Sequence, residues 1–138
     1  SAERLIFAPR VSAVEHLGRL RRADLYLDTF PYTGHATMAD GLFVGVPGVT
    51  LMGESFASRV AGSLLRNLGM EELVTEKRTS YERLAVELAT DSGRLAELKK
   101  RLMTRAQEGG VFDTQSFTKE MEAAYRKMWA DLEPEKIG

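Results

Sequence analysis

Short apolar runs alternate with longer amphipathic stretches over residues 5–75. Four apolar runs predict strands, at residues 5–7, 24–28, 48–52 and 73–75. Three stretches with apolar residues at helical spacing predict helices, at residues 12–23, 36–44 and 56–68. At the start of the first helix, Ser12 and Glu15 have the spacing of a capping box. Strands that alternate with helices through short connections are typical of a parallel sheet built from βαβ units.

The pattern changes after residue 78, and the remainder predicts helices without a further strand. The spacing of a capping box begins at Thr79, and Asp91 predicts the cap of a second helix. Asp113 or Thr114 caps a last helix. Its apolar side chains form one stripe, which consists of Phe117, Met121, Tyr125, Met128 and Trp129. A stripe at this spacing most often faces a core.

The fold class that follows is α/β, the C-terminal part of a Rossmann-like lobe with three to four parallel strands and flanking helices. Residues 1–78 are expected to form the α/β portion, and residues 79–138 a helical segment that packs on the same domain. Residues 133–136 are interpreted as a tail. A doubly wound sheet has about six strands, so the chain is expected to be the second half of a nucleotide-binding fold from a larger protein.

Composition excludes several classes of function. The 138 residues include 19 Lys and Arg and 20 Asp and Glu, a formal net charge of −1. Without a basic surplus we expect no nucleic-acid partner and no membrane partner. The sequence has no cysteine, which excludes disulfides and thiolate zinc sites, and only 2 histidines, so we expect no metal site. No segment approaches the ~20 apolar residues of a spanning helix. We expect a cytoplasmic protein.

The loop at residues 29–34, together with the helix start that follows it, is the strongest candidate for a binding site. It joins the carboxyl end of a predicted strand to the amino end of a predicted helix, and in open α/β sheets ligands bind in this crevice. The unpaired amides of a helix start carry a partial positive charge. They can hold a diphosphate without a cation.

Four residues at this corner suit such a ligand. Gly34 lets the backbone approach closely, and His35 and Thr37 add hydrogen-bond donors beside the phosphates. Asp40 lies about one turn further along and can accept from a ribose hydroxyl. The alternative is an ordinary strand–loop–helix corner with a polar His35 and a solvated Asp40, because no GxGxxG or Walker motif is present.

Three short motifs occur here in a fixed order. Residues 28–40, 45–51 and 53–61 read DTFPYTGHATMAD, GVPGVTL and GESFASRVA. This set resembles the catalytic region of protein O-linked N-acetylglucosamine transferases, the nucleocytoplasmic glycosyltransferases of family 41 that carry tetratricopeptide repeats. It is also similar to their bacterial and SPINDLY-like relatives. The likeness extends from Arg4 to Trp129.

The resemblance implies a GT-B architecture, in which two Rossmann-like lobes face a cleft and the C-terminal lobe binds UDP-N-acetylglucosamine. This chain matches the later part of that lobe. The implied reaction is an inverting transfer of N-acetylglucosamine to Ser or Thr of proteins, with no metal required. The implied partners are the nucleotide sugar and a protein acceptor that is bound by upstream repeats.

The resemblance also assigns nucleotide-binding residues. The family's diphosphate-binding stretch, Gly-His-Thr-Thr, falls on Gly34, His35, Ala36 and Thr37. Its ribose-binding aspartate falls on Asp40, and two residues of the preceding helix that face the nucleotide fall on His16 and Arg19. The catalytic base is unknown and is expected upstream, so the isolated fragment is expected to be inactive.

Two positions depart from the family pattern. Ala36 replaces a threonine of the diphosphate-binding stretch, and Ala13 stands where the family has a lysine. A charged hydrogen bond contributes about 1.5–3 kcal/mol, so weaker nucleotide binding is expected. Three alternatives stay open. In the first, the enzyme uses another nucleotide sugar as donor, such as the GDP-fucose of SPINDLY-like relatives. In the second, it transfers the sugar to a small glycan. In the third, the chain is a non-catalytic interaction or regulatory module.

Several side chains also have simpler explanations. Arg19 follows Glu15 by four positions and can form an exposed ion pair with it. His16 can be a half-buried helix histidine, Glu54 can stabilise a helix dipole, and Arg59 can be a packing or interlobe residue. If the last helical stripe is left uncovered, it favours self-association.

Overall fold

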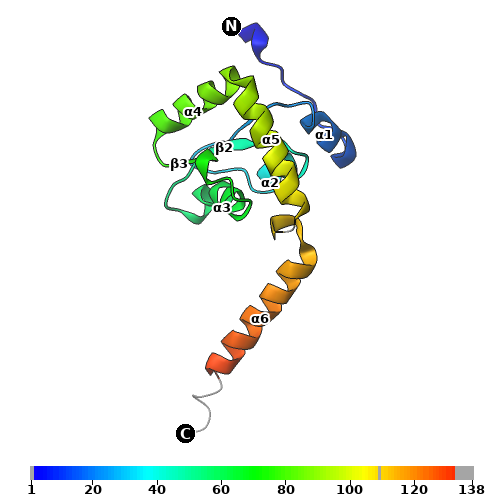
Figure 1. Cartoon of the computed structure of the whole chain (residues 1–138), viewed down its shortest axis with the longest axis vertical. Helices are drawn as coiled ribbons and strands as arrows, with labels where there is room; N and C mark the ends of the chain where they lie inside the picture. Colours follow the sequence, from blue (N-terminus) through cyan, green and yellow to red (C-terminus); the bar gives the residue numbers. More distant parts are fainter. Residues whose placement is uncertain (1, 109, 133–138) are drawn as a thin grey trace.

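A small parallel sheet lies at the centre of the body of the molecule. The computed structural model describes residues 2–108 and 110–132, and Figure 1 shows its elements. Within these residues the strands are β1 (Tyr26–Leu27), β2 (Gly48–Leu51) and β3 (Val74–Thr75). They lie in the order β1-β2-β3, and both pairs are parallel. The predicted βαβ organisation is therefore confirmed.

Helices connect the strands and cover the sheet. The helices are α1 (Ala13–Leu20), α2 (Ala36–Phe43), α3 (Val60–Asn67), α4 (Arg78–Thr90), α5 (Ser92–Gln107) and α6 (Thr114–Leu132). Single 3₁₀ turns are η1 (Ala2–Arg4), η2 (Phe56–Ser58), η3 (Glu71–Leu73) and η4 (Gly110–Phe112). Helix α2 connects β1 to β2, and α3 lies between β2 and β3. In the part of the chain that the structure describes, we find no helix with the length and apolar character of a membrane span.

The predicted strand at residues 5–7 is wrong. Leu5, Ile6 and Phe7 belong to no regular element and are 68%, 89% and 92% exposed. An apolar run becomes a strand only where a neighbouring strand supplies hydrogen bonds and side-chain contacts. Among the described residues this run has no such partner, and the sheet has three strands.

The predicted starts of the helices have mixed outcomes. The capping box at Ser12 is confirmed, because its hydroxyl accepts from the Glu15 amide at 3.4 Å and the Glu15 carboxylate accepts from the Ser12 amide at 3.1 Å. The Ser12 hydrogen bonds lower the pKa of Glu15 below its ordinary value. The capping box at Thr79 is wrong. Helix α4 begins at Arg78 after Lys77, without a side-chain cap, so Thr79 already lies inside the helix.

The single helix predicted over residues 56–68 is two elements. Ser55 caps the short turn η2 by accepting from the Ser58 amide at 3.3 Å. Arg59 then separates η2 from α3. With this break, the Ala57 carbonyl of η2 accepts hydrogen bonds from the loop after β1.

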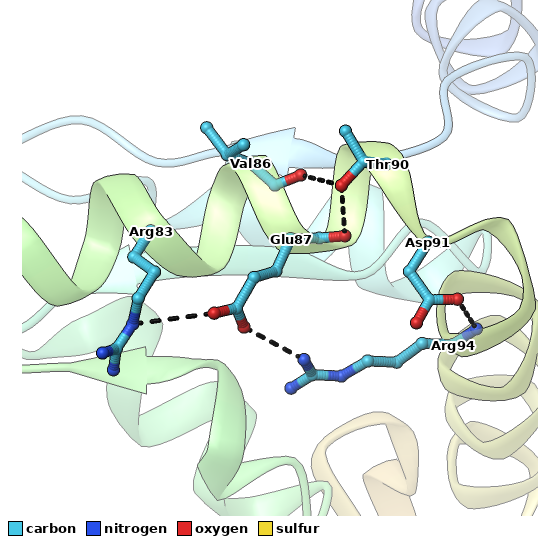
Figure 2. Close-up of polar contacts among 6 residues, drawn as sticks. All are labelled: Arg83, Val86, Glu87, Thr90, Asp91 and Arg94. Carbon is cyan, nitrogen blue, oxygen red and sulfur yellow. Dashed lines mark hydrogen bonds and ion pairs between the residues drawn. The ribbon is translucent and has the colours of Figure 1, made fainter.

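Helices α4 and α5 meet at a polar corner, which Figure 2 shows. The Asp91 carboxylate caps α5, as predicted, by accepting from the Arg94 amide at 2.9 Å. The Glu87 carboxylate lies between two guanidinium groups, 3.6 Å from Arg83 Nε and 3.2 Å from Arg94 Nη1 (Figure 2). The Thr90 hydroxyl donates to two carbonyls of the preceding turn. Exposed ion pairs of this kind contribute little, so apolar burial provides most of the stability of this corner.

The hydrophobic core lies between the sheet and helices α2 to α5. It consists of Met38, Leu42, Val49, Ala61, Leu65, Leu68, Met70, Leu73, Leu84, Leu88, Leu98 and Leu102, each at most 8% exposed. Because α4 and α5 contribute four of these leucines, both helices are part of the same packed unit as the sheet. The division of the chain at residue 78 stays a prediction.

Helix α6 extends away from this unit (Figure 1) and contacts η4. Of the two predicted caps, Asp113 is the one observed, because its carboxylate accepts from the amides of Gln115 at 3.0 Å and Ser116 at 3.1 Å. The apolar stripe of α6 is 40–65% exposed, so its prediction as core is wrong. Helical spacing defines the stripe but not what covers it. The predicted tail at 133–136 lies outside the described residues.

Candidate functional site

The corner between β1 and α2 is organised around Asp28, a carboxylate that is only 6% exposed. Its Oδ1 accepts from the amides of Thr29 at 2.9 Å and Gly34 at 2.6 Å, and its Oδ2 accepts from the Thr50 hydroxyl at 2.6 Å. The Tyr81 hydroxyl of α4 donates to the Asp28 backbone carbonyl at 2.9 Å. Three donors compensate for the burial of this charge. Asp28 therefore connects β1, β2 and α4 to the loop that ends at Gly34.

The Tyr81 hydroxyl remains a donor at neutral pH. Burial raises the pKa of Tyr81 above its ordinary value of 10.0, and the nearby Asp28 carboxylate and Tyr26 phenol raise it further. The neutral hydroxyl can therefore support the Asp28 carbonyl over the whole physiological range.

Gly34 occupies a position with no room for a side chain. A Cβ there would lie 2.7 Å from the Tyr26 hydroxyl oxygen, 3.0 Å from Thr37 Oγ1 and 3.2 Å from Asp28 Oδ1. The φ angle of Gly34 is not positive. The requirement for glycine is thus a requirement for space, set by three oxygen atoms of β1 and the first turn of α2.

His35 stands at the start of α2 with its ring held from three directions. Tyr32 stacks on it with a centroid separation of 4.8 Å, and Phe56 meets it edge-on at 5.9 Å. Its Nε2 lies 3.4 Å from the Ala57 carbonyl oxygen, and which ring nitrogen carries the hydrogen depends on the tautomer. His35 makes no side-chain hydrogen bond that caps α2.

The amino end of α2 is therefore open to a ligand. The first helical hydrogen bond runs from the Ala39 amide to the His35 carbonyl at 3.0 Å, and the amides before it belong to the group that a helix start leaves unpaired. Ala36 and Thr37 are exposed, and Asp40 is partly buried one turn later. The structure thus brings five sequence-predicted residues together on this corner, namely Gly34, His35, Ala36, Thr37 and Asp40.

The other two predicted residues lie on α1, which contacts α2. Arg19 Nη2 lies 3.3 Å from His16 Nδ1, and Arg19 Nη1 donates to the Pro9 carbonyl at 3.0 Å. Arg19 is therefore paired with His16 rather than with Glu15, whose carboxylate is engaged by Ser12. Within the described residues, neither His16 nor Arg19 hydrogen-bonds to the β1–α2 corner.

A cavity of about 540 Å³ opens near the carboxyl ends of β2 and β3. Its lining consists of Phe30, Leu51, Met52, Gly53, Glu54, Arg59, Glu76 and Arg78. None of the sequence-predicted site residues is in this lining. Its two carboxylates and two guanidinium groups balance in charge, so we expect the amino end of α2 to attract an anion more strongly than the cavity does. Glu54 and Arg59 nonetheless face a hollow rather than only a helix dipole or a packed interface.

Sequence reasoning missed Tyr26, Thr50 and Tyr81 as parts of this corner. For Tyr26 and Thr50, the strand pattern of the sequence contains information that could have placed them. Tyr26 and Asp28 are two positions apart on a strand and so share a face, and the pairing of Leu27 with Val49 places Thr50 beside Asp28. Tyr81 comes 53 residues after Asp28, and no local pattern indicates that contact.

The corner presents hydrogen-bond donors, namely helix amides, the Thr37 hydroxyl and an imidazole, in the arrangement that binds phosphate groups. In residues 2–108 and 110–132, no three His, Cys, Asp or Glu side chains gather so that they could hold a metal ion. A negatively charged ligand is the species that these donors suit best.

The sequence profile of Glycosyl transferase family 41 matches residues 1–121. The chain belongs to this family. Family 41 relatives include the probable UDP-N-acetylglucosamine–peptide N-acetylglucosaminyltransferase SPINDLY of Hordeum vulgare, which is 41% identical over 115 residues. That match covers 83% of this chain and 12% of the relative. The UDP-N-acetylglucosamine–peptide N-acetylglucosaminyltransferase of Caenorhabditis elegans is 38% identical over 130 residues, which cover 94% of this chain and 11% of the relative.

A solved structure supports the family 41 assignment. A mutant O-GlcNAc transferase of Thermobaculum terrenum superimposes with a TM-score of 0.81 and 40% sequence identity, over 90% of this chain and 23% of that one. The predicted α/β class, as the C-terminal part of a GT-B lobe, is confirmed. The chain spans only a small part of each relative, so the activity of the whole protein is a matter of proposal.

Proposed function

We propose that this chain is the donor-nucleotide-binding part of a protein O-glycosyltransferase, which transfers N-acetylglucosamine from UDP-N-acetylglucosamine to Ser or Thr of proteins. The observation that carries the proposal is the open amino end of α2, beside His35, in a chain of family 41. Two relatives are named for transfer from this donor to peptides.

The residues of the corner have distinct roles in this proposal. The amides from Ala36 onward, with His35 and the Thr37 hydroxyl, hold the diphosphate, and Gly34 keeps the approach free of a side chain. Asp40 accepts from a ribose hydroxyl. His16 and Arg19 face the nucleotide from α1, where their mutual contact supports both side chains.

The reaction in this proposal is a direct displacement at the anomeric carbon. The acceptor hydroxyl oxygen forms the new glycosidic bond while the bond to the diphosphate oxygen breaks, and the configuration inverts. Negative charge then grows on the leaving diphosphate, and pre-oriented donors stabilise that charge more than they stabilise the ground state. The base that takes the hydroxyl proton lies outside this chain, and no metal takes part.

The proposal extends to the partners and the location. The acceptor is a protein, held by repeats in another part of the polypeptide, so the isolated chain transfers no sugar. The exposed stripe of α6 favours self-association of that isolated chain. A cytoplasmic location is supported by a sequence without cysteine.

The test uses the full-length natural polypeptide that carries this chain. It is titrated with UDP, GDP and UDP-N-acetylglucosamine by calorimetry, and transfer to a Ser/Thr peptide is assayed. We expect UDP and UDP-N-acetylglucosamine to bind, and His35→Ala to weaken UDP about tenfold or more, because a hydrogen bond to a charged group is lost. Tyr125→Ala on α6 serves as the control and leaves affinity unchanged.

Two results would contradict the proposal. Preferential binding of GDP would indicate a transferase with another nucleotide sugar. Absence of binding by every nucleotide at millimolar levels would favour a non-catalytic module, for which Ala13 and Ala36 are the specific observations, because both are exposed and offer no side-chain donor.

A further inference from the structure

Strand β1 and the residue that follows it place two side chains under the amino end of α2. Tyr26 lies in β1 and Asp28 directly follows its last residue, Leu27, so on an extended backbone both side chains point to the same side, where both lie beside Gly34. The backbone there is fixed, because the Tyr26 amide donates to the Pro47 carbonyl at 2.9 Å and the Asp28 amide donates to the Val49 carbonyl at 3.1 Å. Both side chains therefore have a rigid base.

The Tyr26 hydroxyl lies 3.2 Å from Thr37 Oγ1, and either group can be the donor. A threonine hydroxyl has a single hydrogen. When Thr37 donates that hydrogen to a bound anion, its oxygen can still accept, and the Tyr26 hydroxyl is placed to donate to it. Such a chain of two hydrogen bonds polarises the outer donor toward the anion.

Asp28 acts on the other side of Gly34. The Gly34 amide donates to Asp28 Oδ1 at 2.6 Å, so this amide faces the strand and is not available to a ligand. The direction of the chain at Gly34 is thereby fixed, and the amides that face outward begin only after it. Because the Thr50 hydroxyl occupies Oδ2, the carboxylate cannot turn away from the loop without losing a second hydrogen bond.

The two contacts meet at Gly34. The position of its missing Cβ is 2.7 Å from the Tyr26 hydroxyl oxygen and 3.2 Å from Asp28 Oδ1. The loop thus fits between the Tyr26 hydroxyl of β1 and the carboxylate of Asp28, which follows that strand.

We propose that Tyr26 and Asp28 are positioning residues of the donor site, Tyr26 acting through the Thr37 hydroxyl and Asp28 through the Gly34 amide. This assignment rests on the proposed function and adds to it the residues that set the geometry of the phosphate-facing donors. Neither residue touches the nucleotide.

The decisive variant is Tyr26→Phe in the full-length natural polypeptide, because it removes one oxygen and keeps the ring. We expect kcat/KM for UDP-N-acetylglucosamine to fall about threefold to tenfold, the effect of one hydrogen bond. The larger part is expected in kcat, since the charge on the leaving diphosphate grows toward the transition state. The matched control is Tyr125→Phe on exposed α6, for which we expect parental kinetics and a parental melting temperature.

A double-mutant cycle separates positioning from general stabilisation. In a Thr37→Val background, Tyr26→Phe is expected to have no further effect on kcat/KM, because Tyr26 acts through the removed hydroxyl. Full additivity of the two substitutions would overturn the assignment of Tyr26. So would a Tyr26→Phe variant that loses melting temperature and keeps parental kinetics.

Asp28 is tested by comparing two substitutions at a temperature at which both variants are folded. Asp28→Asn keeps an acceptor for the Gly34 amide, and we expect UDP affinity within about threefold of the parent. Asp28→Ala removes the acceptor, and we expect a loss of about tenfold or more. Faster hydrogen exchange of the Gly34 amide in Asp28→Ala, read by NMR without ligand, is expected to accompany it.

The outcomes distinguish this assignment from the proposed function. If the unsubstituted polypeptide binds no nucleotide and transfers no sugar, the proposed function fails, and the assignment fails with it. If the unsubstituted polypeptide is active and Asp28→Ala binds UDP as tightly as the parent, the assignment of Asp28 alone is overturned. Equal losses in Asp28→Asn and Asp28→Ala would also overturn it, because charge rather than the acceptor would then be responsible.

Discussion

The β1–α2 corner and helix α6 are both rich in aromatic side chains, but their surroundings differ. At the corner, Asp28 accepts hydrogen bonds from β2, from α4 and from the loop that follows it, and Met38 behind them is fully buried. Helix α6 extends away from the packed unit (Figure 1) and contacts η4, and its aromatic residues and methionines are 40–65% exposed. The same residue types are thus ordered by neighbours in one region and largely exposed in the other.

This difference separates the periodicity of apolar residues in the sequence from the packing of those residues in the structure. The helical spacing of apolar residues in α6 is as regular as that of a core helix, yet its stripe is exposed. At the corner, a two-residue strand and a glycine loop form a densely bonded unit. Regular periodicity alone therefore does not tell which region is packed. Paired substitutions of the same residue type in the two regions test that conclusion.

The largest effect is expected from a methionine pair. Met38→Ala removes a fully buried side chain from α2, and such truncations lower the free energy of unfolding by about 2–5 kcal/mol. Met128 of α6 is 61% exposed, and Met128→Ala is expected to stay within about 0.5 kcal/mol of the parent. Urea denaturation of the 138-residue chain measures both.

Repeating the methionine pair in the full-length natural polypeptide sharpens the comparison. If Met128→Ala destabilises that protein as much as Met38→Ala does, another part of the polypeptide covers α6. If Met128→Ala destabilises the 138-residue chain itself by a similar amount, the contrast between the corner and α6 is wrong.

A glycine pair is expected to give the next largest effect. Gly34→Ala places a Cβ within 2.7 Å of the Tyr26 hydroxyl oxygen, and such overpacking costs about 1–3 kcal/mol. Gly18 on α1 has nothing within 4 Å of the same position, and Gly18→Ala is expected to stabilise by about 0.4–1 kcal/mol because alanine favours a helix. Thermal unfolding of the two variants checks the opposite signs, and a neutral Gly34→Ala would contradict the packing described here.

The smallest effect concerns the start of α6. The Ser116 side chain, above all, holds the pKa of Asp113 below its ordinary value of 3.8. A carboxyl with a lowered pKa stabilises the fold fully above that ordinary value, and the stabilisation disappears as the pH falls through the lowered pKa. We therefore expect the protection factors of the Gln115 and Ser116 amides, which compare their exchange rates with those of an unfolded peptide at the same pH, to fall at acidic pH, as measured by NMR. Asp113→Asn should abolish this dependence, and an unchanged profile in that variant would refute the role of the carboxyl.

Local signals predicted much of the fold. The Ser12 capping box, the helix after His35, the Asp91 cap and the order of strands and helices depend on residues within a few positions of one another, so the sequence is sufficient to place them. The resemblance carried by residues 28–61 also identified the family.

Features that depend on distant partners were not predictable in this way. The run at residues 5–7 is apolar enough for a strand but has no neighbouring strand among the described residues. The stripe of α6 has the correct spacing, yet its side chains are 40–65% exposed. At the corner, Asp28 opens the family-like motif at residues 28–40, yet its buried network needs Thr50 and Tyr81 from other elements.

The bond from Tyr81 to the Asp28 carbonyl has a consequence for the smallest autonomous unit of this protein. Every residue proposed to contact the nucleotide precedes β3, yet a donor that supports their scaffold arrives 53 residues after Asp28. A fragment that stops between β3 and α4 would retain all of those contacts in its sequence and lack one of the supports that shape them. During synthesis on the ribosome, the β1–α2 corner can gain this hydrogen bond only after the first turn of α4 has emerged.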